Sequence, residues 1–140
     1  MKKLMLLAVV VLTGVCFAKD VYVRPTVVSG DTIRARGKIY RLWGISAPKG
    51  GWNTVAMAAL SQMTKGLEFK LLVNKNYPGV AKFGVFDRDG GKQINPALKL
   101  LKMGLATYRP GDRPADDKNA AIYREAEAAA KKAKIGIWSE

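Results

Sequence analysis

A series of short β-branched segments in the first half of the chain restricts the folds that it can adopt. The segments run from Val21 to Val28, from Thr32 to Arg36 and from Ile39 to Ile45, and each has the length and composition of a β-strand. Ser29-Gly30 and Gly37-Lys38 separate them, and glycine-containing pairs of this kind are typical of hairpin turns. The sequence therefore predicts three consecutive strands joined by tight turns.

Two further strands are expected downstream, from Leu67 to Val73 and from Lys82 to Phe86. The residues between them include Pro78 and Gly79, which favour a loop. Apolar residues at helical spacing predict three helices: one between the third and fourth strands, one that begins with Asn95 and Pro96, and one over residues 119–134. The positions expected to face the core are Trp52, Val55, Ala59 and Met63 in the first helix, Leu98 and Leu101 in the second, and Ile122, Ala126, Ala129 and Ala133 in the third.

The order of these elements is three strands, a helix, two strands and a helical tail. This order is typical of the small barrels that bind oligonucleotides or oligosaccharides. We therefore expect an α+β fold, with a five-stranded OB-fold-type β-barrel and three flanking helices. No internal repeat or domain linker interrupts the sequence, so these elements are expected to form one domain.

Charge restricts the partners and the chemistry. The chain has 24 Lys and Arg against 11 Asp and Glu, a formal charge of +13, and it has no histidine. The basic excess lies within residues 19–111, with sixteen basic and five acidic side chains, whereas residues 112–140 hold six of each. A strongly basic surface favours a polyanionic partner. The absence of histidine excludes Ser-His-Asp and Cys-His catalysis and histidine-ligated metal sites.

The N-terminal 18 residues have the pattern of a secretory leader. Lys2 and Lys3 precede an apolar run that ends at Cys16-Phe17-Ala18, as in a signal peptide with a small-residue cleavage site. The run is shorter than the about 20 residues of a membrane span. We therefore expect a signal peptide over residues 1–18, a mature chain from Lys19 in the secreted or periplasmic space, and no stable membrane anchor. Lipidation of Cys16 is an alternative that Val15 disfavours.

Four blocks of the mature chain resemble one known family in content and order. They are Val28-Ser29-Gly30-Asp31-Thr32-Ile33, Tyr40-Arg41-Leu42-Trp43-Gly44-Ile45-Ser46-Ala47-Pro48, Ile94-Asn95 with Gly104-Leu105-Ala106, and Gly136-Ile137-Trp138-Ser139. The chain is similar to the staphylococcal nuclease (thermonuclease) family, whose members hydrolyse nucleic-acid phosphodiester bonds with Ca²⁺. The resemblance implies one nuclease-like OB-fold domain over residues 19–140.

The resemblance also implies roles for individual residues. Asp31 matches a calcium ligand, and Arg41 matches an arginine that contacts the scissile phosphate. The family has Asp and Glu, a second calcium ligand and the general base, where this chain has Ser46 and Lys49. Ala47 can still offer its carbonyl. Since calcium needs about six to eight oxygen ligands, Asp31 with Ser46 and Ala47 nearby is at most the remnant of a metal site, and no cofactor is expected.

Other positions bear on the binding of nucleic acid. The family's second catalytic arginine has no counterpart between Tyr77 and Lys82. Lys82 is the nearest cation, but it lacks the planar grip of a guanidinium. Tyr108 follows the Gly104-Leu105-Ala106 block, as do the nucleotide-stacking tyrosines of the family. We therefore expect Arg41, Lys49, Lys82, Tyr77 and Tyr108 to bind nucleic acid or nucleotide, with Arg41 and Lys49 at the position of the former catalytic site.

Three functions are consistent with these residues. The first is a secreted, thermonuclease-like domain that binds DNA, RNA or nucleotide and has lost its phosphodiesterase chemistry. The second is an active Ca²⁺-dependent endonuclease in which another carboxylate, such as Asp20 or Glu68, completes the site. The third is a non-catalytic protein-interaction module whose basic surface only confers solubility.

Overall fold

The computed structural model describes residues 22–74, 77–83, 94–111 and 117–140, and the side chains of 72–83 and 117–119 lie outside this description. The leader predicted over residues 1–18 also lies outside it. In chain order the elements are β1 (Tyr22–Val23), β2 (Thr26–Ser29), β3 (Thr32–Ala35), β4 (Lys38–Leu42), β5 (Ile45–Ser46), α2 (Gly51–Thr64), β6 (Phe69–Asn74), β7 (Tyr77–Phe83), α3 (Pro96–Lys102), β8 (Thr107–Tyr108), α4 (Asp117–Ala133) and the 3₁₀ helix η1 (Gly136–Ser139).

The strands form a six-stranded sheet in the order β1-β6-β7-β4-β3-β2 and a separate two-stranded sheet of β5 and β8. All pairs are antiparallel except β4 with β7, which is parallel. Within the described residues the sheet is open, because its edge strands β1 and β2 do not pair with each other. In the described part of the chain the fold is α+β with three α-helices, as expected, but the strands do not close into the five-stranded OB-type barrel that was predicted.

Two predicted strands are each divided in the structure. Pro25 lies between β1 and β2, where its missing N–H interrupts the ladder. Gly44, with φ +81°, lies between β4 and β5 and turns the chain away from the main sheet. The tyrosine ring of Tyr123 packs so closely against Gly44 that an added Cβ would lie 2.8 Å from it. A side chain at position 44 is therefore excluded by both the turn and the packing.

The turn between β3 and β4 is displaced by one residue from the predicted Gly37-Lys38. Ala35 pairs with Lys38, so the two loop residues are Arg36 and Gly37, with φ of 53° and 79°. Two consecutive positive φ values are typical of a type I′ hairpin. The strand predicted from Lys82 to Phe86 begins earlier, because β7 includes Pro78 and Gly79 beside a register shift at Val73/Asn74.

The helices confirm the predicted positions and correct two of the buried faces. Asn95 caps α3, since its side chain accepts a hydrogen bond from the Leu98 N–H at 3.2 Å. In α2 the buried residues are Ala56, Leu60 and Thr64, whereas Val55 is 46% exposed. In α4 the buried side chains include Tyr123, whereas Ile122 is 43% exposed. Ala126 is buried as predicted, and Trp52, Ala59 and Met63 pack against the core as partly buried side chains. The buried face of each helix is therefore rotated from the predicted one and overlaps with it.

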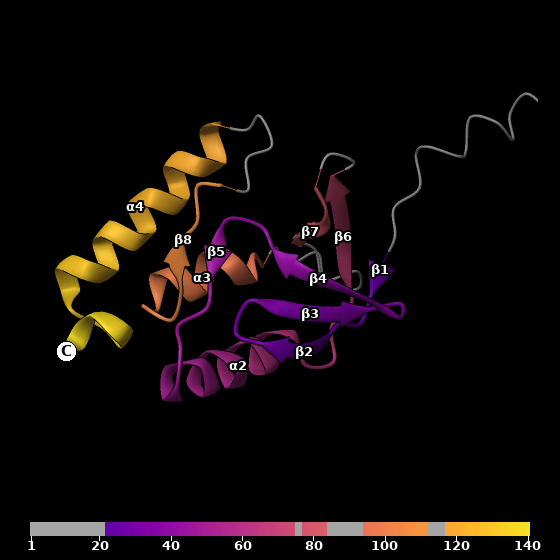
Figure 1. Ribbon diagram of the computed structural model, residues 1–140, viewed down its shortest axis with the longest axis horizontal. Helices are drawn as coiled ribbons and strands as arrows, with labels where there is room; N and C mark the ends of the chain where they lie inside the picture. Colours follow the sequence, from indigo (N-terminus) through magenta and orange to yellow (C-terminus); the bar gives the residue numbers. More distant parts are fainter. Residues whose placement is uncertain (1–21, 75–76, 84–93, 112–116) are drawn as a thin grey trace, which may run out of the picture.

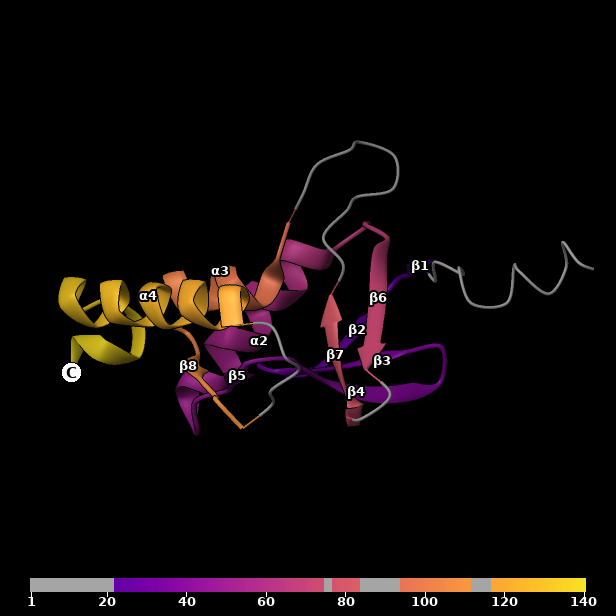
Figure 2. The same ribbon diagram turned by 90° about the horizontal axis from the view of Figure 1, so that it is seen from above.

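Helices α3 and α4 lie at one end of the molecule, whereas α2 packs along the sheet (Figure 1). In Figure 1, α2 lies along β2 and β3, and α4 lies at the far side from the β3–β4 turn. Figure 2 shows α3 and α4 side by side at one end, in agreement with their contacts. The core between these parts contains Ile33, Leu42, Leu60, Phe69, Leu100 and Leu101. Trp43 and Tyr123 meet edge to face within it, 4.9 Å between ring centroids. No helix in the described residues is long and apolar enough to cross a membrane.

Candidate functional site

The turn between β2 and β3 is held by the carboxylate of Asp31. Its Oδ1 accepts hydrogen bonds from the hydroxyls of Ser29 and Thr32, both at 2.9 Å. Its Oδ2 accepts the backbone N–H of Ala47 at 3.0 Å. Asp31 is half-buried. The carboxylate therefore joins the turn to the segment that follows β5, and each of its oxygens already has a donor from the protein.

The same turn is packed against the first turns of α2. The N–H of Gly30 donates to Asn53 Oδ1 at 2.9 Å. A Cβ at Gly30 would lie 2.8 Å from Ala56 Cβ and 3.1 Å from Ala47 Cβ, so only glycine fits without displacement. Asn53 is a positioning residue that the sequence did not reveal, because an asparagine in the first turn of a helix has no distinctive pattern.

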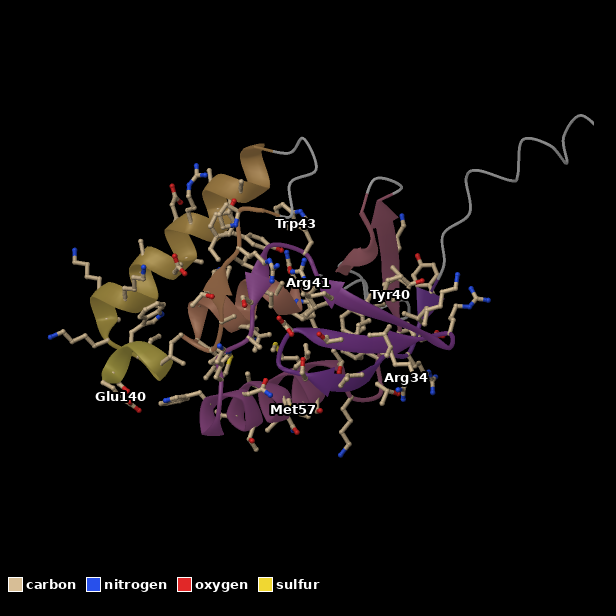
Figure 3. All side chains as sticks on the ribbon, viewed as in Figure 1. Arg34, Tyr40, Arg41, Trp43, Met57 and Glu140 are labelled. Atoms are coloured by element: carbon tan, nitrogen blue, oxygen red, sulfur yellow. The ribbon has the colours of Figure 1, made fainter. Side chains whose placement is uncertain are left out.

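Arg41 lies next to Asp31 across the β3–β4 ladder. Thr32 pairs with Arg41, and the N–H of Leu42 donates to the carbonyl of Asp31 at 2.7 Å. The guanidinium of Arg41 is half-buried and donates from Nη1 to the carbonyl of Ile45 at 3.3 Å. Figure 3 shows Arg41 between the sheet and the helical half of the molecule. The structure thus brings the predicted residues Asp31 and Arg41 together.

The segment after Arg41 positions Ser46, Ala47 and Lys49. Ser46 pairs with Thr107 of β8, and its carbonyl accepts the Thr107 hydroxyl at 3.4 Å. Ala47 donates to Asp31, as described above. Lys49 lies in the loop that leads to α2, and its side chain is exposed. Its ammonium therefore faces solvent, two residues after Ala47, which bonds to Asp31.

The donor set around Asp31 does not fit a calcium ion. Calcium takes about six to eight oxygen ligands and gains affinity from carboxylates. Here the carboxylate of Asp31 accepts three hydrogen bonds, and Ser46 and Lys49 replace carboxylates with a hydroxyl and a cation. Among the described residues there is no group of three or more acidic, cysteine or histidine side chains that could hold a metal. No step of a reaction can be derived through a metal from these residues.

Tyr108 lies on the neighbouring strand β8. It pairs with Ile45, whose carbonyl accepts Arg41, and its own N–H donates to Glu127 Oε2 at 2.8 Å. Tyr108 is half-buried and packs against the core. The structure therefore places Tyr108 in the neighbourhood of Arg41, and its ring contributes to packing.

Of the four other predicted positions, two lie on β7, whose Val80 pairs with Arg41, one precedes β6, and one is outside the described residues. Tyr77 and Lys82 lie on β7, where Tyr77 pairs with Asn74 and Lys82 with Leu72, and their side chains are outside the described residues. Glu68, a candidate additional ligand, precedes the end of β6 that pairs with β1. The part of β6 nearest to Arg41 is at its other end. There Val73 pairs with Ala81 of β7, and Ala81 pairs with Leu42, the residue after Arg41. Asp20 lies outside the described residues.

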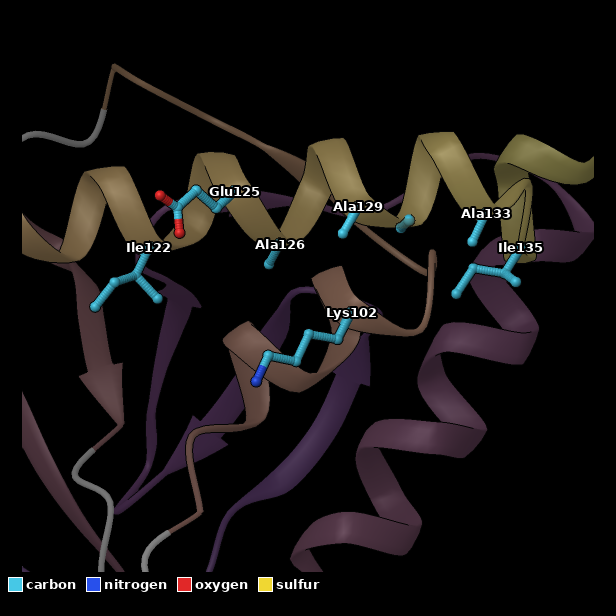
Figure 4. A pocket seen from close by; sticks show the side chains of 8 residues that line it. Lys102, Ile122, Glu125, Ala126, Ala129, Ala133 and Ile135 are labelled. Carbon is cyan, nitrogen blue, oxygen red and sulfur yellow. The ribbon is translucent and has the colours of Figure 1, made fainter.

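One cavity is separate from these residues. It has a volume of about 630 Å³ and lies between α4 and α3. Figure 4 shows Lys102 on one side and Ile122, Ala126 and Ile135 on the other. None of the residues that line it belongs to the Asp31–Arg41 neighbourhood.

A comparison with protein families now relates this geometry to a known group. The family described as Staphylococcal nuclease homologue matches residues 40–140. The chain belongs to this family. Membership implies nuclease-related binding or hydrolysis of nucleic acid. The match begins in β4 and includes Arg41, Ser46, Lys49 and Tyr108, whereas Asp31 precedes it. A comparison with individual curated proteins found no match.

Proposed function

We propose that this staphylococcal nuclease-like domain binds the phosphates of DNA, RNA or a nucleotide at Arg41 and no longer hydrolyses them. The observation that supports this most directly is the state of Asp31. Its carboxylate is used for three hydrogen bonds within the protein, and the chain has no carboxylate at positions 46 and 49. Without a metal ligand set and a general base, the site lacks the groups that activate water.

Arg41 is the group that can bind phosphate. A guanidinium forms two parallel hydrogen bonds to phosphate oxygens and stays charged at all working pH values. The bond from Nη1 to the carbonyl of Ile45 helps to orient the guanidinium. Lys49 adds an exposed positive charge, and Lys82, Tyr77 and Tyr108 are the further contacts in this proposal. Aromatic rings that stack on bases contribute about 1–3 kcal/mol per base.

The sheet supports this function as an OB-type binding surface. The strands β6-β7-β4-β3-β2 are five consecutive members of the main sheet. The OB-fold is a five-stranded, partly open barrel that binds oligonucleotides on the face of its strands. We propose that these five strands form the binding sheet of such a fold, with Arg41 on the third of them in chain order.

The proposal includes export of the protein. Residues 1–18 have the pattern of a signal peptide, and a mature chain from Lys19 would act in the periplasm or outside the cell. The mass of the protein recovered from the periplasm or the medium tests this directly. A full-length mass on protein from the cytosol would contradict it.

The central experiment measures cleavage and binding on the purified mature chain. Single-stranded DNA and RNA are incubated with several divalent metals and with chelator, and Arg41→Ala is compared with Arg124→Ala, which removes an exposed charge on α4. We expect binding that weakens steeply as salt rises, that Arg41→Ala reduces, and that is not followed by cleavage. Cleavage that chelator and Arg41→Ala both abolish would instead establish the Ca²⁺-dependent endonuclease. If the parent shows no salt-dependent binding of DNA or RNA, the result would favour the third function, a non-catalytic protein-interaction module.

A further inference from the structure

The β3–β4 hairpin carries three cationic side chains within five residues. Arg34, Arg36 and Lys38 are all exposed. Lys38 pairs with Ala35 and therefore lies on the face opposite to Arg34, so we call Arg34 and Arg36 the hairpin cations. Strands β2, β3 and β4 contain no Asp or Glu. The tip of the hairpin extends away from α4 in Figure 1, and Figure 3 shows Arg34 on the outer side of the sheet. The hairpin cations therefore form a positive surface at the end of the molecule opposite the C-terminal helix.

We leave Arg24 out of this surface, although it is exposed and near in sequence. Arg24 follows β1, and the pairing of Val23 with Phe69 brings Arg24 next to Glu68. An adjacent carboxylate reduces the charge that Arg24 presents to a polyanion.

The backbone at Arg36 is unfavourable for arginine. Arg36 has φ +53° and is followed by Gly37 with φ +79°. Asn, Asp and Gly adopt the first position of such a type I′ turn at lower cost. An arginine at this position is therefore not explained by the stability of the hairpin, and its exposed side chain makes no hydrogen bond or ion pair with another described residue.

The hairpin cations and Arg41 lie on one continuous path. Arg34 and Thr32 are two positions apart on β3 and share a face, opposite to the buried side chains of Ile33 and Ala35. Thr32 pairs with Arg41, so Arg41 shares that face as well. From Thr32 to Arg36 the strand advances four residues, about 13 Å at about 3.3 Å per residue. This distance is longer than one phosphate group can span, so contact with both Arg41 and Arg36 requires more than one nucleotide.

We propose that the hairpin cations are a second contact for the sugar-phosphate backbone of a single nucleic-acid strand whose phosphate is bound at Arg41. This inference depends on the proposed function and adds a length requirement to it. A mononucleotide reaches only Arg41, whereas an oligonucleotide reaches both surfaces. The protein then binds oligonucleotides more tightly than nucleotides through charge along β3 and not through the Arg41 site alone.

The chain offers a matched pair of variants for the test. Lys134, which follows the end of α4, is also exposed and also has a positive φ, 55°. Arg36→Asn and Lys134→Asn each remove one positive charge from a left-handed position, and neither removes a buried contact. Both variants are expected to fold at least as stably as the parent, which a melting curve verifies. Arg41→Ala is the third variant.

The probes are a nucleoside 3′,5′-bisphosphate and a single-stranded DNA of about 16 nucleotides, the upper end of OB-fold site sizes. Arg36→Asn should reduce the slope of log K against log salt by about 0.7 for the DNA, which corresponds to about fivefold weaker binding at about 0.1 M salt. Its affinity for the bisphosphate should not change. Lys134→Asn should change neither affinity, and Arg41→Ala should weaken both. The single variant Arg34→Gln should repeat the effect of Arg36→Asn, because it also removes one charge.

The failures of the two proposals are distinguishable. If the parent binds DNA in an Arg41-dependent way while Arg36→Asn and Arg34→Gln bind it equally well, the hairpin surface is refuted and the proposed function stands. Equal weakening by Lys134→Asn would show that net charge alone matters and would also refute the hairpin surface. If the parent binds neither probe, both proposals are wrong.

Discussion

Replacing Asp31 with alanine separates a structural role from a metal-binding role for this carboxylate. The change removes three hydrogen bonds, and the one from the Ala47 N–H joins two segments 16 residues apart. A bond from a backbone amide to a charged acceptor contributes about 1.5–3 kcal/mol. The two hydroxyl donors can turn to water because the turn is half-buried, so we count about 0.5 kcal/mol for each. Asp31→Ala should therefore lower the free energy of unfolding by about 2.5–4 kcal/mol.

Urea denaturation of the mature chain, in chelator, measures this effect. The midpoint should fall while the m-value stays constant, which indicates a change of stability rather than of the unfolded state. Ser29→Ala and Thr32→Val serve as controls, and each should cost well under half of the Asp31→Ala effect. A carboxylate held in place only to bind a metal would be neutral or unfavourable in chelator. If Asp31→Ala is as stable as the parent, or more stable, the structural role is refuted.

Three further predictions concern the end of α4, a glycine contact and the lost chemistry. Lys134→Gly should raise the free energy of unfolding by about 0.5–1 kcal/mol, because a left-handed residue at a helix end favours glycine; an unchanged melting temperature would contradict this. Gly104→Ala should destabilise by about 2–5 kcal/mol, since φ is +71° and the added Cβ would overlap the backbone carbonyl of Ile135, and equal stability in urea would refute that. Ser46→Asp with Lys49→Glu should produce chelator-sensitive cleavage of DNA absent from the parent, whereas an inert double variant would mean that the missing arginine on β7 also prevents catalysis.

The sequence predicted the elements more accurately than their boundaries. The strands and helices have local signals, such as the Asn95 cap, which the structure confirms. The exact turn at Arg36-Gly37 could not be predicted, because Gly37 suits either loop position and the choice depends on which residues pair across the hairpin. Pro78 indicated a loop, but a register shift in β6 lets β7 include it. Strand pairing, which determines both features, is not encoded in short windows of sequence.

The candidate site was predictable in its residues but not in its contacts. The family resemblance indicated Asp31 and Arg41, and the β3–β4 register brings them together. The carboxylate of Asp31 accepts a hydrogen bond from Ala47, and the neighbouring Gly30 donates one to Asn53, 23 residues further along the chain. These contacts depend on how β5 and α2 pack against the β2–β3 turn. Only the three-dimensional arrangement therefore shows that both carboxylate oxygens of Asp31 already accept hydrogen bonds from the protein.

The charge of the site explains how phosphate binding can continue without a metal. With the family's Asp and Glu at positions 46 and 49, three carboxylates would repel a phosphate until a divalent cation neutralised them. In this chain the carboxylate of Asp31 is opposed by Arg41 and Lys49, so the formal charge of these residues is positive. A phosphate is then attracted directly. Binding of oligonucleotide should accordingly be the same in chelator and in calcium, as fluorescence anisotropy can measure, and a requirement for calcium would refute this account of the site.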